Sequence, residues 1–355
     1  MTNSVCRILE HFAARGHRAV VVTPGPSIEE YAGHPVVAVP GFALPGYKSF
    51  VLGLPTTARV EKVIRDFEPD VIHLASPIML GAAGVAVARK LEIPSVAVFQ
   101  TDIAGFARRY GFRGADRAIW AWLRHVHRQA DRTLVPSRAT LSQLMEHGIP
   151  NLAMWRRGVD ADRFHPRHRS ESLRAHLAPN GELIVGYVGR LSADKSVDQL
   201  ACLADLPGVK LVIVGDGPAA GKLRELLPNA VFTGFLTGDD LSRMYASLDV
   251  FVHTGADETF CQAIQEAMAS GVPVVAPAAG GPLDLVEPGR TGFLYEPDSL
   301  SELRDAVRRL CAGSLLRAEY GRRARVGVVR RTWPAVCDEL LGHYGDVMAA
   351  RSAAA

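Results

Sequence analysis

Residues 249–294 read DVFVHTGADETFCQAIQEAMASGVPVVAPAAGGPLDLVEPGRTGFL. The apolar run 250–253 predicts a buried strand, turn residues follow it, and an amphipathic helix is predicted to begin near Thr259. Further on, 274–276 and 292–295 predict two more short strands with glycine-rich turns between them. Strands that alternate with helices in this order predict a parallel α/β sheet.

The same alternation extends over the rest of the chain. Apolar runs at 19–22, 36–39, 71–74, 96–99 and 133–135 alternate with helical patterns at about 56–67, 77–91, 114–130 and 137–147. After a polar stretch, a second series of strands is predicted at 184–188, 210–214 and 231–233, and the chain closes with three helices at about 299–311, 315–330 and 335–349. The pattern predicts two doubly wound, Rossmann-like domains.

Length and composition limit the class of protein. A chain of 355 residues accommodates two α/β domains, and 22% charged with 48% hydrophobic residues indicates a globular protein. No window reaches the roughly 18 to 20 apolar residues of a membrane span, and the N-terminus lacks a secretory signal, so a cytoplasmic location is expected. The five cysteines are scattered without a C-x2-C pair, which predicts neither a disulfide framework nor a zinc site.

Two glutamates stand out in the opening stretch. Glu258 falls in the loop after the predicted strand, and Glu266 lies about two turns further on the same helix face. Loops at the carboxyl edge of a parallel sheet bind ligands, so an acidic group there can meet the hydroxyls of a sugar or ribose. The alternative is that both are solvated helix charges.

A cationic turn follows the first strand of the second series. Gly189 ends that strand, Arg190 comes next, and Lys195 lies five residues after Arg190. A glycine turn that leads to a helix with two cations nearby suits a diphosphate. The alternative is an ordinary surface arginine and lysine. The turn at Asp216 and Gly217 is weaker, because any tight strand-to-helix connection can use glycine.

Taken together, these motifs resemble the donor site of retaining glycosyltransferases of the GT-B fold, the large family 4 group. The residues that match the family pattern are Glu258, Phe260, Glu266, Gly280, Gly281 and 289–294. Cys261 stands where many members of that family have glycine. The resemblance covers nearly the whole chain.

The resemblance implies a domain organisation. Residues 1–165 would form an acceptor-binding Rossmann-like domain and 166–333 a nucleotide-sugar-binding one. Residues 334–355 would form a helix that crosses back to the first domain, as the final helix does in GT-B enzymes.

It also implies roles for individual residues. Arg190 and Lys195 would bind the donor phosphates and stabilise the leaving nucleoside diphosphate, so neither a metal nor another cofactor is expected. Glu258 would contact the transferred sugar and Glu266 the nucleotide ribose. The predicted donor-binding set is Gly189, Arg190, Lys195, Asp216, Gly217, Phe235, Glu258, Phe260, Cys261 and Glu266.

Asp102 is the remaining catalytic candidate, beside Arg190, Lys195 and Glu258. It follows an apolar strand of the first domain, in a loop where members of the family often carry His or Asp facing the sugar. The departing phosphate is thought to deprotonate the acceptor in such enzymes, and Asp102 would be the nucleophile of the alternative double displacement. A polar residue after a strand can equally be a helix N-cap.

Several segments indicate which subgroup of this glycosyltransferase family the chain resembles. LASPIMLG, FQTDIAGFARRYG and the ETFCQ block look like actinobacterial mannosyltransferases that transfer mannose from GDP-mannose to glycolipid or phosphoinositide acceptors. A UDP-sugar-dependent glucosyl- or sulfoquinovosyl-transferase is the first alternative. A nicotinamide dehydrogenase is more distant, because no strand is followed by G-x-G-x-x-G with an acidic residue about 20 positions on. A sugar-binding protein without activity would leave the Arg190, Lys195 and Glu258 cluster unexplained.

The first half of the chain contains a basic segment. Between Gly105 and Arg132 there are seven arginines, from Arg108 onward, interleaved with aromatic residues. We expect this segment to contact an anionic membrane surface, which would make the protein peripheral at the inner face of the cell membrane. The alternative is an ordinary basic helix packed on the core by its tryptophans. Nothing predicts nucleic-acid binding.

The chain opens on a predicted helix with no strand before it. A doubly wound domain ordinarily begins with a central strand whose loop feeds the first helix. In the resembled family an apolar strand and a loop precede the sequence that corresponds to 2–5. We therefore expect that about 15 to 20 native residues precede Met1.

Overall fold

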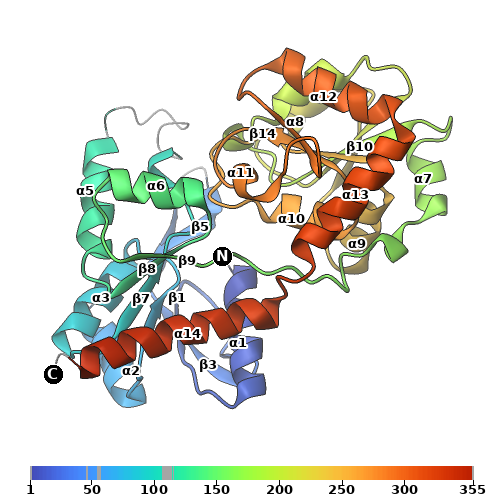
Figure 1. The fold of residues 1–355 in the computed structure, drawn as a ribbon. Coiled ribbons are helices and arrows are strands. Elements are labelled where there is room, and N and C mark those ends of the chain that lie inside the picture. Colours follow the sequence, from blue (N-terminus) through green and yellow to red (C-terminus); the bar gives the residue numbers. More distant parts are fainter. Residues whose placement is uncertain (1, 45–46, 54–56, 106–113, 115, 354–355) are drawn as a thin grey trace. The chain divides into compact units, whose positions relative to one another are not determined.

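The computed structural model describes residues 2–44, 47–53, 57–105, 114 and 116–353. These residues form two compact units (Figure 1). Of the described residues, unit 1 contains 2–44, 47–53, 57–104, 114, 116–157 and 333–353, and unit 2 contains Gly105 and 158–332.

Unit 2 is an alternating series of strands and helices. Its strands are β10 (Leu183–Val188), β11 (Val209–Val214), β12 (Val231–Gly234), β13 (Val250–Val252), β14 (Val274–Pro277) and β15 (Gly292–Tyr295). Its α-helices are α7 (Glu171–Leu177), α8 (Ala220–Leu226), α9 (Gly238–Ser247), α10 (Gln262–Ala269), α11 (Pro282–Leu285), α12 (Leu300–Ala312) and α13 (Ser314–Val328). The described part of the unit also contains the 3-10 segments η1 (Pro166–His168), η2 (Ala193–Lys195) and η3 (Val197–Leu203).

The six strands of unit 2 form one parallel sheet in the order β12-β11-β10-β13-β14-β15. Alternate residues of β10 belong to different cores: Ile184 and Val188 pack in one hydrophobic cluster, and Val185 and Tyr187 pack in the other. Both faces of the sheet are therefore covered, which is why its strands read as short continuous apolar runs in the sequence. This is the doubly wound arrangement that the alternating pattern predicted.

Unit 1 contains more varied elements. Its strands are β1 (Val21–Pro24), β2 (Glu30–Tyr31), β3 (His34–Val39), β4 (Gly41–Leu44), β5 (Tyr47–Gly53), β6 (Ile72–Leu74), β7 (Ser95–Val98), β8 (Arg132–Val135) and β9 (Leu152–Met154). Its α-helices include α1 (Thr2–Arg15), α2 (Thr57–Phe67), α3 (Leu80–Lys90), α5 (Asp116–His127), α6 (Arg138–Glu146) and α14 (Trp333–Ser352).

The strands of unit 1 fall into three sheets. β6, β7, β8 and β9 form a four-stranded parallel sheet in chain order. β1 pairs with β3 in parallel, and the short β2 adds to β3 in the antiparallel direction. β4 and β5 form an antiparallel hairpin that the sequence pattern did not predict. The βα alternation therefore explains the parallel strands and leaves the hairpin unexplained.

Helix α14 completes unit 1 although it follows unit 2 in the chain. Figure 1 shows it in red, running across unit 1 near α1. Val336, Leu340 and Tyr344 on α14 join one hydrophobic cluster with Ile8 of α1 and Val96 of β7. The Tyr344 hydroxyl also lies 2.7 Å from Nδ1 of His73, which follows Ile72 in β6. The prediction that the last helix returns to the first domain is confirmed.

α14 has 20 residues, which corresponds to about 30 Å of helix, the thickness of a bilayer core. It nevertheless carries charged side chains such as Asp338, which forms ion pairs with His11 and Arg15 of α1. Among the described residues, no helix is both long and apolar enough to cross a membrane.

Candidate donor site

The centre of the unit 2 sheet is a topological switch point. β10 pairs with β11 on one side and with β13 on the other, so the chain connections leave this pair of strands toward opposite edges of the sheet. Open α/β sheets bind ligands outside the carboxyl ends of the strands at such a point. The loops that begin at Gly189 and at His253 therefore lie where such a sheet binds its ligand.

The loop after β10 is organised by a buried aspartate. One Nη atom of Arg190 donates to Oδ2 of Asp194 at 2.7 Å, and the Ser192 hydroxyl donates to Oδ1 at 2.7 Å. The loop leads into η2, a 3-10 turn, whereas the sequence suggested the amino terminus of an α-helix. Asp194 fixes the direction of Arg190, and the tight turn carries Lys195 toward the neighbouring loop.

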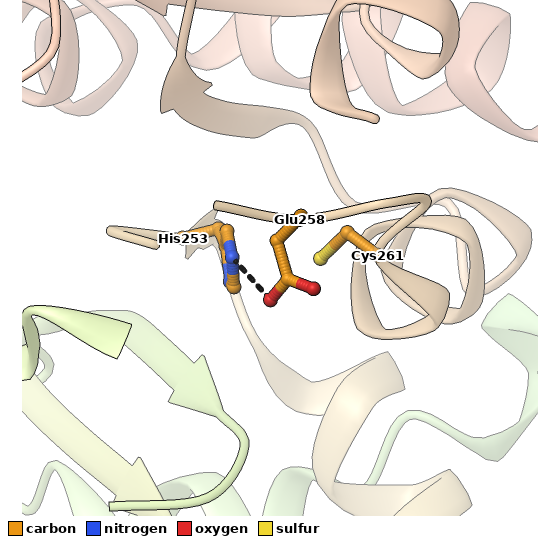
Figure 2. A group of neighbouring side chains, drawn as sticks. All are labelled: His253, Glu258 and Cys261. Atoms are coloured by element: carbon orange, nitrogen blue, oxygen red, sulfur yellow. Dashed lines mark ion pairs between the residues drawn. The ribbon is translucent and has the colours of Figure 1, made fainter. Parts of the chain in front are cut away.

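Lys195 and Glu258 meet across the switch point. Nζ of Lys195 donates to Oε1 of Glu258 at 2.6 Å, and both side chains are mostly buried. The Thr254 hydroxyl donates to the Lys195 carbonyl at 2.7 Å, which ties the two loops together. Nε2 of His253 lies 3.0 Å from the same Oε1 atom (Figure 2). The structure thus brings two of the predicted catalytic residues into direct contact.

The charges of this pair support each other. Burial alone would raise the pKa of Glu258, but the Lys195 ammonium and the His253 side chain outweigh it and hold the pKa well below its usual value. Burial alone would lower the pKa of Lys195, and the Glu258 carboxylate outweighs this and raises it. Both groups are therefore charged at neutral pH, which gives the site a fixed cation and a fixed anion.

Two glycines explain why the loop of Glu258 can pack where it does. The backbone N–H of Gly281 donates to the Glu258 carbonyl at 2.7 Å. A Cβ atom at Gly281 would lie 2.3 Å from the Phe260 carbonyl oxygen, and one at Gly280 would lie 2.4 Å from that of Glu258. Any larger residue at 280 or 281 would push the Glu258 loop away, so the Gly-Gly pair is a steric requirement of the site.

Helix α10 begins three residues later than the sequence predicted. Cys261 has φ = 75°, in the left-handed region, so the chain cannot enter the helix before Gln262. Glu266 lies one turn inside α10, facing Tyr245 and Arg163. Burial raises the pKa of Glu266 to about 7, although the Tyr245 hydroxyl and the Arg163 guanidinium both act to lower it. The pKa of Glu258 is therefore lowered and that of Glu266 is raised.

The other predicted donor residues lie on neighbouring loops of unit 2. Asp216 and Gly217 follow β11, where Leu191 N–H donates to the Asp216 carbonyl at 2.9 Å and a Cβ at Gly217 would lie 2.3 Å from the Leu191 carbonyl oxygen. Phe235 follows β12 with 78% of its surface exposed. Phe260, two residues after Glu258 on the same loop, is buried.

Asp102 lies in unit 1, in the segment that follows β7. Nε2 of Gln143 on α6 donates to its Oδ2 at 3.4 Å, a long hydrogen bond. Nearby, one Nη atom of Arg157 donates to Oε1 of Gln100 at 2.5 Å, and Arg157 also bonds the buried Ser4 hydroxyl of α1. Asp102 is thus part of a polar group at the carboxyl edge of the unit 1 sheet.

Sequence reasoning missed His253 and Asp194. His253 directly follows β13, and its ring stacks on that of Tyr187 with centroids 6.2 Å apart and planes at 9°. A histidine directly after a buried strand and before a glycine turn was an available signal, because strand ends at a switch point face the ligand. The only sequence signal for Asp194 was its position four residues after Arg190. His253, Glu258 and Cys261 are also a described group whose ligand atoms lie close enough to hold a metal ion.

A parallel sheet of this order, with a cationic turn facing a buried glutamate at its switch point, is the donor-domain arrangement predicted for a GT-B glycosyltransferase. Two sequence families match the chain: Glycosyltransferase Family 4 over residues 1–163 and Glycosyl transferases group 1 over residues 168–326. The chain belongs to the family 4 glycosyltransferases, and it is an enzyme of that class.

Individual proteins agree with this family. The chain is 51% identical to a GDP-mannose-dependent alpha-mannosyltransferase of Mycolicibacterium smegmatis, over 99% of this chain and 95% of that protein. It is 35% identical to a sulfoquinovosyl transferase of Arabidopsis thaliana, over 95% of this chain and 69% of that protein. Anabaena HepE in complex with UDP has the same GT-B fold, with a TM-score of 0.79 at 21% identity, covering 97% of this chain and 96% of HepE.

The environment of Glu266 predicts that nucleotide binding depends on pH. If its carboxylate accepts hydrogen bonds from ribose hydroxyls, the ionised form binds more strongly than the neutral acid. Because its pKa in the free protein is raised to about 7, the dissociation constant for GDP should fall as pH rises from about 6 to about 8. Calorimetry in buffers of different ionisation enthalpy should detect proton release on binding near pH 7.

Glu266→Gln is the matched variant, because it keeps the shape and cannot ionise. Its GDP affinity should show a flat profile over the same pH range. The unliganded wild type should also lose stability as pH rises from 4.5 toward 7, because the folded state retains a proton that the unfolded state releases. An unchanged pH slope in Glu266→Gln would assign the dependence to another group.

Proposed function

We propose that this enzyme is a retaining mannosyltransferase that transfers mannose from GDP-mannose to a lipid-linked acceptor, a glycolipid or a phosphoinositide. The observation that carries the proposal is the Lys195 and Glu258 pair at the switch point of unit 2, which offers a cation and an anion within 2.6 Å of each other. The donor follows from the similarity to the GDP-mannose-dependent enzyme of Mycolicibacterium smegmatis, which spans nearly the whole chain.

The residues of the site bind different parts of the donor. Lys195 and Arg190 neutralise the charge that develops on the leaving diphosphate, Glu258 accepts hydrogen bonds from the mannose hydroxyls, and Glu266 accepts from the ribose. Asp194 holds Arg190 in place. Fixed charges in a largely buried site stabilise a transition state more than the same charges in water, because they need no reorganisation.

The reaction then proceeds on one face of the sugar. The bond from the anomeric carbon to the diphosphate oxygen breaks, and the acceptor hydroxyl oxygen forms the new bond on the same side. The acceptor proton passes to the departing diphosphate, so no side chain has to act as a general base. A double displacement through Asp102 is the alternative, and a covalent glycosyl-enzyme detected by mass spectrometry would favour it.

We propose that the reaction needs no metal cofactor. Two side-chain cations, Arg190 and Lys195, lie at the turn where the diphosphate is expected, and cationic side chains can stabilise a transferring group as a divalent ion does. Activity retained after exhaustive treatment with a chelator would support this, and activity restored only by an added divalent ion would contradict it.

Ligand binding distinguishes the candidate donors directly. We expect GDP to raise the melting temperature of the intact protein, since a ligand at 100 times its dissociation constant stabilises a protein by about 2.7 kcal/mol. UDP should shift it less and NAD should not shift it. A larger shift with UDP would favour a UDP-sugar donor, and a shift with NAD alone would favour a dehydrogenase. Nuclear magnetic resonance of the product then reports the anomeric configuration.

A lipid-linked acceptor would place the enzyme at the inner face of the cell membrane. In the basic segment that was expected to contact lipid, Arg108, Arg109 and Arg113 lie outside the described residues. Of the described part, α5 buries Trp120, Leu123 and Val126 and leaves Trp122 at the surface. A cavity of about 440 Å³ is lined by Arg89, Arg128, Arg132 and Arg351 together with Asp131 and Asp346. Arg132 pairs with Asp346 and Arg351 with Asp131, so Arg89 and Arg128 are the guanidinium groups that support binding of anionic headgroups.

Vesicle co-sedimentation tests the membrane proposal. Binding should increase with the fraction of anionic lipid and fall with salt, with each exposed basic side chain adding about 1 kcal/mol. Replacing Arg89 and Arg128 together by alanine should weaken it, whereas Arg322→Ala on α13 serves as the control. Binding that ignores both lipid charge and salt would contradict the proposal.

A further inference from the structure

Three side chains with metal-binding atoms converge beside the donor site. Figure 2 shows His253 at the end of β13, Glu258 on the following loop and Cys261 at the start of α10, all pointing toward one another. Their ligand atoms lie within 4.8 Å of one another, and the His253 and Cys261 side chains are buried. The three atom types are an imidazole nitrogen, a carboxylate oxygen and a thiol sulfur.

The histidine leaves one ring nitrogen without a hydrogen bond. Within the described part of the chain, Nδ1 of His253 has no hydrogen-bond partner, whereas Nε2 lies 3.0 Å from the Glu258 carboxylate. Only 2% of His253 is exposed, and its ring is held parallel to that of Tyr187. A buried polar atom without a partner is costly, so its retention calls for a ligand that the free protein lacks.

The cysteine is held in an unfavourable backbone conformation. Cys261 adopts φ = 75°, a region that costs a residue with a side chain of the order of 1 to 3 kcal/mol and that glycine enters freely. The site nevertheless carries a thiol at this position. Backbone strain of this kind persists where it serves a site, because the surrounding structure must enforce it.

We propose that His253, Glu258 and Cys261 form a binding site for a thiophilic divalent cation, with zinc as the expected ion, and that its occupancy inhibits the enzyme. Zinc takes nitrogen, oxygen and sulfur ligands in tetrahedral geometry and uses sites with three protein ligands and one open position. In a tetrahedral zinc site the ligand atoms lie roughly 3.5 Å from one another. The ligand atoms of these three side chains lie within 4.8 Å of one another, so binding requires them to move together by about 1 Å.

Inhibition follows from the position of Lys195. Its ammonium group lies 2.6 Å from Oε1 of Glu258 and 3.7 Å from the Asp194 carboxylate. A divalent ion on Glu258 would repel this ammonium at close range in a site largely shielded from water. Zinc and the Lys195 contact therefore exclude each other, and a zinc-bound site loses both the carboxylate and the cation that the donor needs. This inference rests on the proposed role of Glu258 and Lys195.

Cobalt is the probe, because a thiolate ligand gives bound Co²⁺ a charge-transfer absorption band that can be followed without measuring activity. Titration of the intact, reduced protein with Co²⁺ should produce this band, and Zn²⁺ should remove it by displacement. Cys261→Gly and Cys261→Ser should lose the band and bind at least about tenfold more weakly, since even an outer-shell partner of a metal ligand is worth 10- to 100-fold. Cys202→Ala, which changes a thiol elsewhere in unit 2, is the control and should titrate as the wild type does.

Lys195→Ala is the second variant for the Co²⁺ titration. Removing the competing cation should tighten Co²⁺ binding about tenfold or more, even though the same change damages catalysis. GDP-mannose should displace the metal from the wild type. No thiolate band in the wild type, an equal band in both Cys261 variants, or no gain in affinity in Lys195→Ala would each overturn the inference. Binding of GDP to metal-free protein is measured separately, so the proposed function can stand or fall on its own.

Discussion

Lys195→Ala should reduce the turnover of sugar transfer by about 10²- to 10³-fold, the scale expected when one preorganised charge-stabilising group is removed. Nζ of Lys195 is held at 2.6 Å by Glu258, and the Lys195 backbone is fixed by Thr254, so the ammonium needs little reorganisation as charge builds on the leaving diphosphate. Alanine removes this charge and leaves the Glu258 carboxylate without its ammonium partner. Steady-state kinetics with the nucleotide sugar and any acceptor that supports transfer would measure the effect.

Stability has to be separated from catalysis in this experiment. Removing one partner of a buried ion pair costs about 3 to 5 kcal/mol, and the low end is expected because the Lys195 and Glu258 side chains keep 19% and 16% exposure. The variant should therefore melt at a lower temperature and still be folded at 25 °C. Lys222→Ala, at an exposed position on α8, is the matched control. Wild-type turnover in folded Lys195→Ala would show that the phosphates bind elsewhere.

Glu258→Gln should lower kcat/KM for the sugar donor by a similar factor, about 10²-fold or more, and affect GDP binding much less. Glutamine keeps the shape and loses the negative charge that offsets the burial of Lys195. Because burial by itself lowers the pKa of Lys195, the variant should also weaken the cation at the diphosphate. Comparing kcat/KM for the donor with the dissociation constant of free GDP separates sugar recognition from nucleotide recognition.

Glu287→Gln is the control for that comparison. Glu287 lies in the same part of unit 2, with 58% of its side chain exposed and an ion pair to Arg290. Glu287→Gln should change neither kcat/KM for the donor nor the dissociation constant of GDP measurably, because exposed ion pairs contribute little to stability. If Glu258→Gln weakened GDP and the sugar donor equally, Glu258 would belong to the nucleotide and not to the sugar.

The donor side of the fold could be foreseen because its signals are local. Strands β10 and β14 were predicted within one residue at each end, since both are short apolar runs bounded by polar or glycine turns. The contact between Lys195 and Glu258 follows once β10 and β13 are neighbours, because parallel strands bring their carboxyl ends to one edge. The sequence analysis did not predict that pairing, since no local pattern specifies the order of strands in a sheet.

Features set by tertiary packing escaped prediction. The sequence could mark His253 as a polar residue at a strand end, but only the fold reveals that its ring meets Glu258. The late start of α10 depends on the left-handed backbone of Cys261, a conformation that no propensity assigns to cysteine. The β4 and β5 hairpin has no two-residue Asn-Gly or Asp-Gly turn to signal it.

The return of α14 to unit 1 also has a consequence for the order in which the protein folds during synthesis. All named strands and helices of unit 2 come from one continuous segment, and its two ends pair with each other where the N–H of Val159 donates to the Arg331 carbonyl at 2.8 Å. That unit can close as soon as Thr332 has left the ribosome. Unit 1 starts earlier and finishes later, because Val336, Leu340 and Tyr344 of its core are translated last. Until then, the part of the enzyme made first presents an uncovered apolar face to chaperones and proteases.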